Sequence, residues 1–304
     1  MIEGEKLLIT GPTGMVGRPL TLALAKNNDV WAAARFSDAS ARAELEAAGV
    51  HCSTIDLIKG DLGTLPTDFT YLLNFSVTKT LRWGDDLDGN AGGIAALMNH
   101  CRDARAVLHC SSTGVYQPNG HHRFREDDPL GDNHRVLEFL ATYSICKIAA
   151  EGAARFSARQ LNLPTTIARL NVPYGDDGGW PALTFEFMRS GSPVPVNADP
   201  PSLYNPIHTD DMLRTIPGLL SAASVPATVV NWAGDETVSV EEWCTYMGEL
   251  TGIEPRFETS SMALPSVAID TTYLNSLVGP STVGWKDGFR RMISSLHPEL
   301  LHAS

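Results

Sequence analysis

The feature that most constrains this chain is a short apolar run followed by three glycines at three-residue spacing. The run 7–9 is typical of a buried strand, and Gly11, Gly14 and Gly17 lead directly into a helical pattern over 19–26. Such a turn presents backbone N–H groups at a helix N-terminus, where the partial positive charge favours a pyrophosphate. The first glycine permits the tight turn, the second lets the backbone approach the phosphates, and the third lets the helix pack on the strand. The pattern therefore predicts a dinucleotide-binding turn, against the alternative of a glycine-rich loop without a ligand.

Composition limits the classes of partner. The 304 residues are enough for one large domain, or for one domain with a smaller lobe. A net charge of −12 argues against nucleic acid and anionic membranes as partners. The five cysteines show no CxxC spacing, which predicts reduced thiols in a cytoplasmic protein, and the histidines show no metal-binding pair. Neither a signal peptide nor a membrane span is expected.

Alternating strand and helix signals in the first half predict an α/β fold with a doubly wound parallel sheet of Rossmann type. Residues 1–170 are expected to form this domain, with 206–225 returning to it. Residues 171–205 and 226–304 are expected to form a smaller substrate-binding lobe at the C-terminal side. The expected strands after the first are 30–35, 51–56, 70–75, 106–110 and 165–170, and the expected helices include 40–48, 92–104 and 136–160.

Two arginines bear on the choice of cofactor. Arg35 ends the second expected strand, where an acidic residue would bind the ribose hydroxyls of NAD and a basic one the 2′-phosphate of NADP. Arg18 follows the third glycine and is placed to approach the same phosphate. Two guanidinium groups favour NADP, with NAD as the alternative, because Arg binds phosphate bidentately. The competing interpretations are solvated surface charges, or an arginine lying over the adenine ring. Asp56 is placed to accept a bond from the adenine amino group, or else caps its strand.

A tyrosine and a lysine four residues apart stand on the long expected helix. Tyr143 and Lys147 share one helical face, so the ammonium can act on the phenol. A free phenol is a poor base at neutral pH, and a nearby cation lowers its pKa. The pair therefore predicts a proton donor and acceptor. Ser112 follows the expected strand 106–110, at the sheet edge where ligands bind, and its hydroxyl can hold the substrate oxygen that gains charge. Its alternative role is a turn that satisfies its own backbone.

These motifs together resemble the extended short-chain dehydrogenase/reductase family, also called the NAD-dependent epimerase/dehydratase family. The resemblance covers most of the chain. The segments that carry it are Thr10–Gly17, Asp56-Leu57, Asn90 with Gly93, Ser111–Tyr116, Glu126–Pro129, Tyr143-xxx-Lys147, Arg169 with Tyr174-Gly175, and Ile207–Asp211.

The resemblance implies a role for each matching residue. It makes Tyr143 the proton relay, Lys147 the residue that holds the nicotinamide ribose, and Ser112 the catalytic hydroxyl. Asp210 and Asp211 are expected to be structural caps. Together with the residues argued above, the predicted cofactor contacts are Gly11, Thr13, Gly14, Met15, Val16, Gly17, Arg18, Arg35, Asp56, Leu57, Asn74, Phe75, Ser76, Tyr143, Lys147 and Asn171.

Departures from the family's pattern limit the reaction. Family dehydratases carry an Asp-Glu pair where this chain has Thr113 and Gly114, so dehydration is not expected. Sugar-nucleotide enzymes place an Arg just before the HVDD-like segment, and 202–206 holds no cation. In the family's RxxNVYG segment, Asn171 stands one place early.

The sequence therefore predicts an NADP-preferring oxidoreductase that acts on a carbonyl or alcohol of a small molecule. The alternative is a UDP-sugar epimerase with tightly bound NAD. A third hypothesis, an NADP-sensing regulator, fits less well because such proteins lose the Tyr/Lys pair. The two long expected helices could pair across a two-fold axis in a homodimer.

Overall fold

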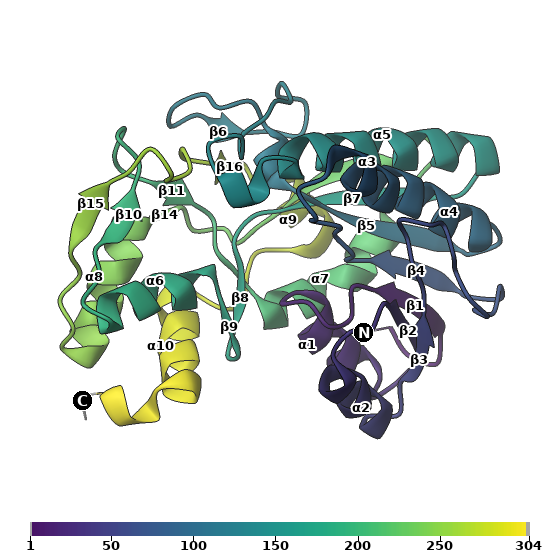
Figure 1. Ribbon diagram of the computed structural model, residues 1–304, viewed down its shortest axis with the longest axis horizontal. Coiled ribbons are helices and arrows are strands. Elements are labelled where there is room, and N and C mark those ends of the chain that lie inside the picture. The colour runs from purple at the N-terminus through teal and green to yellow at the C-terminus, as the bar shows by residue number, and fades with distance from the viewer. Residues whose placement is uncertain (1, 302–304) are drawn as a thin grey trace.

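A seven-stranded parallel sheet forms the centre of the molecule, with the strand order β13-β7-β5-β4-β1-β2-β3 (Figure 1). The computed structural model describes residues 2–301. The strand order reverses direction between β1 and β4, which creates the crevice where open α/β sheets bind ligands. The predicted Rossmann-type fold is confirmed. The strands are β1 Lys6–Thr10, β2 Asp29–Ala34, β3 His51–Thr54, β4 Tyr71–Asn74, β5 Ala106–Ser112, β7 Thr165–Leu170 and β13 Thr228–Trp232.

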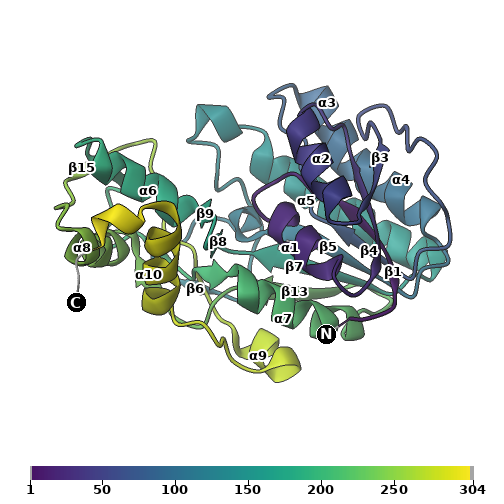
Figure 2. The same cartoon turned by 90° about the horizontal axis from the view of Figure 1, so that it is seen from below.

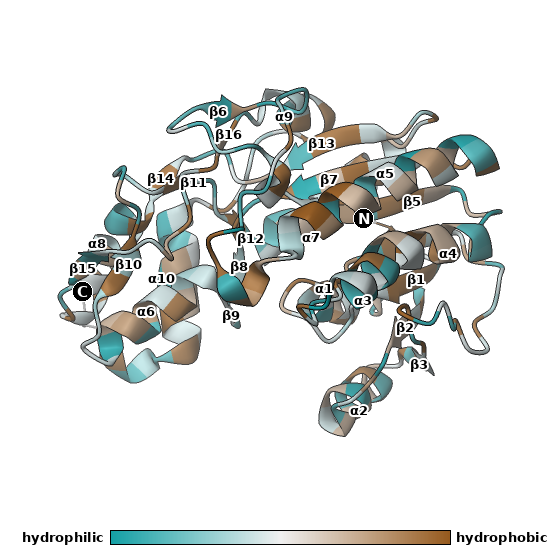
Figure 3. Ribbon diagram, turned by 45° about the horizontal axis from the view of Figure 1, so that its top comes forward, coloured by the Kyte–Doolittle hydropathy of each residue, from teal (hydrophilic) through white to brown (hydrophobic). Residues whose placement is uncertain are grey.

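Helices cover both faces of this sheet because consecutive residues of its central strands are buried, and Figure 3 shows brown, hydrophobic stretches in β5, β7 and β13. One face buries a core shared with α1 (Gly17–Leu24), α2 (Ala39–Ala47), α7 (Thr209–Ser221) and α9 (Thr272–Val278). The other face packs against α4 (Gly93–His100) and α5 (Tyr143–Leu161), with α3 (Trp83–Leu87) beside them. The result is a three-layer domain with its carboxyl strand ends open.

The later segments build a second lobe with its own core (Figures 1 and 2). Its helices are α6 (Trp180–Arg189), α8 (Val240–Thr251) and α10 (Trp285–Leu296). Its short strands include β8 Pro173–Gly175, β9 Gly178–Gly179, β10 Val194–Val196, β11 Leu203–Tyr204, β14 Val238–Ser239, β15 Phe257–Thr259 and β16 Ala268–Ile269, the last paired with β6 Arg123–Phe124. No helix among the described residues is long and apolar enough to cross a membrane.

The chain returns to the sheet for longer than the sequence predicts. The returning segment begins at β12 (Ile207–His208), continues through α7 and ends with β13, which pairs with β7 at the sheet edge. The predicted boundary at residue 225 thus falls one strand too early. Because β13 follows α7 through a short connection, the two elements add one more helix–strand unit to the sheet.

The long helix also begins later than predicted. Residues 136–142 were expected in the helix 136–160, but α5 starts at Tyr143, after the single 3₁₀ turn Glu138–Leu140. Tertiary hydrogen bonds account for this: the Thr142 hydroxyl binds Asp86 and the Ser144 hydroxyl binds the Gly114 carbonyl. These bonds outweigh the helical propensity of the preceding residues.

Candidate active site at the carboxyl edge of the sheet

The glycine turn is closed in a way that only small residues permit. Gly11 has φ +70°, and a Cβ there would lie 2.7 Å from the carbonyl carbon of Phe75. A Cβ on Gly17 would overlap the carbonyl oxygen of Gly11, so the start of α1 can approach β1 only without a side chain. Gly14 is roomier, with its Cβ position 3.5 Å from that oxygen. The turn therefore fits a pyrophosphate at the N-terminus of α1.

A cleft opens beside this turn, between the ends of β1, β2 and β4. It collects six of the predicted cofactor contacts: Gly11, Thr13, Arg35, Asp56, Leu57 and Ser76. It also contains residues that the sequence analysis did not single out: Ala33, Ala34, Phe36, Ser37, Asp38, Ile55, Ile58, Val77 and Thr78.

Asn74 ends β4, two residues before Ser76, which lines the cleft. Its buried Oδ1 accepts bonds from the hydroxyls of Thr10 (2.5 Å) and Ser76 (2.6 Å), and its amide donates to Nδ1 of His109 (2.9 Å). The same Oδ1 also accepts from the backbone N–H of Ser76 (3.2 Å), so Asn74 fixes the backbone of a residue that lines the cleft. Because Nδ1 of His109 accepts, its proton lies on Nε2, which is buried without a partner among residues 2–301. Burial lowers the pKa of His109 to about 3, so this imidazole is neutral.

The two arginines occupy different environments. Arg35 lines the cleft, and no carboxylate of the described chain pairs with it. Arg18 instead donates from Nε to Glu44 of α2 (2.9 Å) and from Nη1 to Asp177 of the β8–β9 turn (3.3 Å). Arg18 thus links the first turn of α1 to α2 and to the second lobe. Of the two, Arg35 is the cation available to a phosphate.

Asp56 and its neighbours form the far wall of the cleft. Its Oδ1 accepts a bond from the backbone N–H of Ile58 (3.1 Å), and its Oδ2 pairs with Nζ of Lys59 (3.1 Å). Asn90 holds Thr78, another residue that lines the cleft, because its amide donates to the Thr78 carbonyl (2.8 Å) and its Oδ1 accepts from the Thr78 N–H (3.1 Å). Internal hydrogen bonds thus hold residues on this part of the cleft in place.

Ser112, Tyr143 and Lys147 come from two segments that are bonded to each other. Ser112 ends β5, and its Oγ accepts from the N–H of Gly114 (3.0 Å). The Gly114 carbonyl in turn accepts from Ser144 (2.7 Å), the residue after Tyr143. Lys147, one helical turn further on, is buried and donates to the Cys110 carbonyl (2.9 Å). The end of β5 and the first turn of α5 therefore face each other across these bonds.

The sequence analysis missed two side chains near the start of α5, where Tyr143 lies. The ring of His134 lies 4.9 Å from the Tyr143 ring, between centroids, in a loop without a recognisable motif. Asp86 is buried under the loop after β4 and accepts from Thr142 (2.7 Å). The acidic pair Asp85-Asp86 at the start of α3 gave no signal, because such residues usually serve as exposed helix caps.

Asn171 is built into the protein. Its Oδ1 accepts from the N–H groups of Val172 and Asn205, both at 2.9 Å. Its amide donates to Thr113 Oγ1 and to the Val267 carbonyl, both at 3.0 Å. With every donor and acceptor of its side chain used, Asn171 joins the end of β7 to the second lobe and has none free for the cofactor contact that the sequence predicted.

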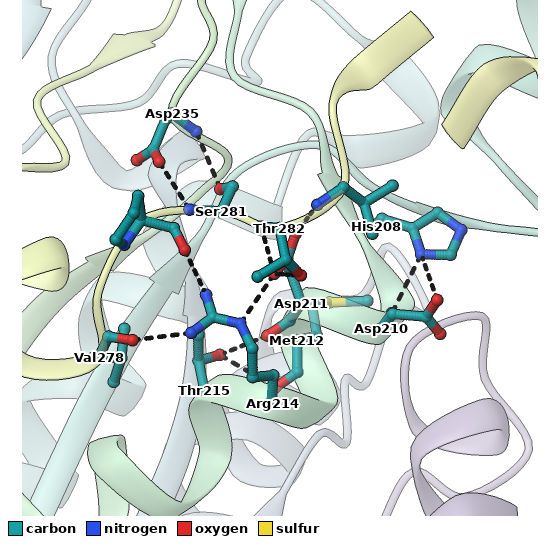
Figure 4. Close-up of polar contacts among 12 residues, drawn as sticks. His208, Asp210, Asp211, Met212, Arg214, Thr215, Asp235, Val278, Ser281 and Thr282 are labelled. Carbon is teal, nitrogen blue, oxygen red and sulfur yellow. Dashed lines mark hydrogen bonds and ion pairs between the residues drawn. The ribbon is translucent and has the colours of Figure 1, made fainter. Parts of the chain in front are cut away.

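The Ile207–Asp211 segment is part of the fold's internal hydrogen bonding, but the side chain that caps α7 is His208 and not Asp210 or Asp211, which were expected to be caps (Figure 4). His208 accepts from the backbone N–H of Asp210 (3.1 Å) at the start of α7. Asp211 is buried and accepts from the N–H of Thr282 (2.9 Å), among other donors, and from Nε of Arg214 (3.0 Å). These bonds attach the segment between α9 and α10 to α7.

A buried ion pair supports the floor of the site. Arg169 of β7 donates from Nε and Nη2 to the two oxygens of Glu151 of α5, at 2.9 and 2.8 Å. Glu151 also accepts from Ser111 (2.6 Å), and Arg169 reaches the Tyr116 hydroxyl (3.1 Å). The network joins α5, β5 and β7 directly behind Ser112 and Lys147.

The chain is similar in sequence to one family of known proteins. The profile of the NAD dependent epimerase/dehydratase family matches residues 7–224. No curated protein matches the chain.

Several solved structures share the fold. UDP-glucuronic acid 4-epimerase from Bacillus cereus, in complex with UDP-glucuronic acid and NAD, has a TM-score of 0.80 and 18% identity, over 97% of this chain and 99% of that one. MoeE5 in complex with UDP-glucose and NAD has a TM-score of 0.78 and 23% identity, over 97% and 99%. DesIV, a dTDP-glucose 4,6-dehydratase from Streptomyces venezuelae with NAD and TYD bound, has a TM-score of 0.79 and 18% identity, over 96% of this chain and 97% of that one. At these identities the likeness establishes the shared fold.

Proposed function

Because the chain belongs to the NAD dependent epimerase/dehydratase family, we propose that it exchanges hydride between NADP(H) and a carbonyl or alcohol of a small molecule. One observation carries the proposal. The first turn of α5 holds Tyr143 and Lys147 and is bonded through Ser144 to Gly114, next to the Ser112 hydroxyl. The three predicted catalytic groups thus belong to one connected corner of the sheet edge.

A dinucleotide fits the residues beside that corner. The glycine turn, where Cβ atoms on Gly11 or Gly17 would collide with backbone, matches a pyrophosphate, and the cleft next to it matches an adenosine. When bound, the nicotinamide supplies or accepts the hydride. Lys147 has one of its three N–H donors on the Cys110 carbonyl, which leaves two for the nicotinamide ribose and its surroundings.

The protein's own groups then handle the proton and the oxygen. In reduction, Tyr143 gives its proton to the substrate oxygen, and the buried ammonium of Lys147 stabilises the phenolate that remains. The Ser112 hydroxyl donates to the same oxygen as negative charge develops there. Neither Thr113 nor Gly114 offers an acid or base for elimination, so we propose plain hydride exchange rather than dehydration.

Arg35 supports NADP as the preferred cofactor. It lines the adenosine cleft without a carboxylate partner, so its guanidinium is available to a 2′-phosphate. Arg18, the second predicted phosphate ligand, is held by Glu44 and Asp177 and contributes less. NAD is the alternative, because the similar structures named above contain NAD and Asp38 lines the same cleft.

A UDP-sugar epimerase is the second candidate, favoured by the UDP-sugars bound in two of the similar structures. The segment 202–206 argues against it. Ser202 is buried, and its N–H donates to the Glu241 carboxylate (3.1 Å). Asn205 is buried and its amide donates to the Gly234 carbonyl (3.0 Å). This region therefore presents an anion and closed hydrogen bonds where a substrate diphosphate would need a cation.

A turnover screen tests the proposal. Purified protein is assayed for NADPH and NADH oxidation with ketones and aldehydes, and separately for interconversion of UDP-sugars without added cofactor. We expect carbonyl reduction with NADPH, and Tyr143→Phe should lower kcat at least about 100-fold, because it removes the proton donor. Turnover that survives this substitution would falsify the mechanism. Epimerisation with cofactor retained through purification would select the second candidate.

A further inference from the structure

The imidazole of His134 fills the space that a side chain at position 114 would occupy. A Cβ on Gly114 would overlap His134 Cε1, and it would lie 2.6 Å from His134 Nδ1 and 3.2 Å from Ser112 Oγ. The His134 ring also packs on the ring of Tyr143. A residue from the loop after β6 therefore lies beside both Gly114, which follows Ser112 by two residues, and the ring of Tyr143, in a position that the glycine leaves free.

The hydrogen bonds of His134 determine which nitrogen carries its proton. The Ser144 hydroxyl has a single proton, which it donates to the Gly114 carbonyl (2.7 Å). The same oxygen accepts from the backbone N–H of His134 (3.2 Å) and lies 3.0 Å from its Nδ1. With the hydroxyl proton already used, Nδ1 must be the donor, so the lone pair is on Nε2. Burial lowers the pKa of His134 to about 4, which keeps the ring neutral.

Nε2 is thus a fixed acceptor with no donor among residues 2–301. We propose that His134 Nε2 accepts a hydrogen bond from a hydroxyl group on the substrate, beside the carbon that exchanges hydride. The substrate class is then an α-hydroxy carbonyl compound, or in the reverse direction a vicinal diol. This inference rests on the proposed function, since it takes Ser112 and Tyr143 as the groups that hold the reacting oxygen. A substrate without that hydroxyl leaves a half-buried acceptor unpaired and binds less well.

The tautomer can be measured without any substrate. With ¹⁵N-labelled histidine, a long-range ¹H–¹⁵N spectrum of the whole protein distinguishes the two neutral forms, and His134→Gln assigns the signal by its loss. We expect His134 as the Nδ1–H form, and we expect Ser144→Ala to remove that preference. A His134 signal in the Nε2–H form would overturn the inference, whatever the enzyme turns over.

A matched pair of substrates tests the hydroxyl contact. We expect kcat/KM for 2-hydroxycyclohexanone to exceed that for cyclohexanone by about ten-fold, as one hydrogen bond can supply. His134→Phe should bring this ratio close to one, mainly through a higher KM for the hydroxy ketone, and His134→Gln should keep part of it because its amide oxygen can accept. A variant with only a damaged fold would lower both substrates alike and leave the ratio intact.

The outcomes separate this inference from the proposed function. Reduction of cyclohexanone and 2-hydroxycyclohexanone with equal efficiency, or a preference that His134→Phe does not change, overturns the role of His134 and leaves the oxidoreductase intact. Absence of all carbonyl turnover overturns both, with the nitrogen spectrum still reporting whether the acceptor exists.

Discussion

Thr142 donates a hydrogen bond of 2.7 Å to the buried carboxylate of Asp86, and the next residue is Tyr143. The same carboxylate accepts from the backbone N–H groups of Thr80 (2.6 Å) and Leu81 (3.0 Å). Asp86 therefore ties the loop after β4 to the start of α5. It positions Tyr143 without touching the cleft where the cofactor is proposed to bind.

Replacing this carboxylate should destabilise the protein in a pH-dependent way. Burial raises the pKa of Asp86, and the bonds from Thr80, Thr142 and Leu81 lower it by more, so its folded pKa lies below the usual range. The ionised form thus stabilises the fold, and this contribution disappears as the pH falls through the folded pKa. We expect Asp86→Asn to cost about 2 kcal/mol in urea unfolding at neutral pH, with the difference from wild type shrinking below about pH 4.

Thr142→Val is the matched control, because it removes one of these donors and leaves the carboxylate. It should cost about 1 kcal/mol. Equal costs for the two variants, or a difference between wild type and Asp86→Asn that persists at low pH, would contradict the assigned role.

Substitutions at two glycines of the turn should have different effects, one on the stability of the fold and the other on the affinity for NADP. Gly17→Ala should destabilise the cofactor-free protein by about 1–3 kcal/mol, because its Cβ would overlap the Gly11 carbonyl oxygen. Gly14→Ala should leave stability within about 0.5 kcal/mol, since its Cβ position has ordinary contacts, and yet weaken NADP binding. Urea unfolding and calorimetric titration with NADP measure the two effects. Unchanged affinity in Gly14→Ala would mean that the phosphates do not approach this backbone.

Because Arg169 and Glu151 form a buried ion pair, we expect the effects of replacing them on the free energy of unfolding to be strongly non-additive. Arg169→Met alone should cost about 3 kcal/mol, because the buried Glu151 carboxylate loses its bidentate partner and keeps only the partly exposed Arg155 guanidinium, 3.7 Å away, as a cation. The double variant with Glu151→Leu should be less destabilised than the sum of the two single variants. Chemical denaturation of all four proteins gives the coupling energy, and additive costs would show that the two charges act independently.

Arg35 should control the cofactor preference. Arg35→Glu should weaken NADP binding about ten-fold or more while changing NAD binding little, because it removes the cation available to the 2′-phosphate. Arg18→Gln is the control variant. Its effect on the ratio of NADP affinity to NAD affinity should be smaller, since Glu44 and Asp177 already hold that guanidinium. Titrating each variant with both cofactors decides the matter. An unchanged ratio in Arg35→Glu would remove the argument for NADP.

Periodicity and glycine spacing predicted the sheet and its edge because those signals are local. The strand 165–170 and the first four strands lie where apolar runs placed them, within one or two residues. The start of α5 was mispredicted because Thr142 and Ser144 bind partners far away in the sequence. The engagement of Arg18 could not be read from its position beside the glycine turn, since Asp177 belongs to a turn of the second lobe.

In the candidate site too, the sequence predicted the residues that local patterns mark and missed those that only the folded loops bring into contact. Tyr143, Lys147 and Ser112 stand out through spacing and through the strand that they follow. Asp86 and His134 act through contacts that depend on the folded loops, and no pattern of neighbouring residues announces them.

The contact between Gly114, which has no side chain, and the ring of His134, twenty residues later in the chain, affects how chains of this fold are compared. When sequences are compared residue by residue, Gly114 counts as a position without a functional side chain. In three dimensions the space beside Gly114 is filled by the His134 imidazole, which comes from the loop after β6. A comparison of sequences alone would therefore not show which side chain lies next to Ser112 in this chain.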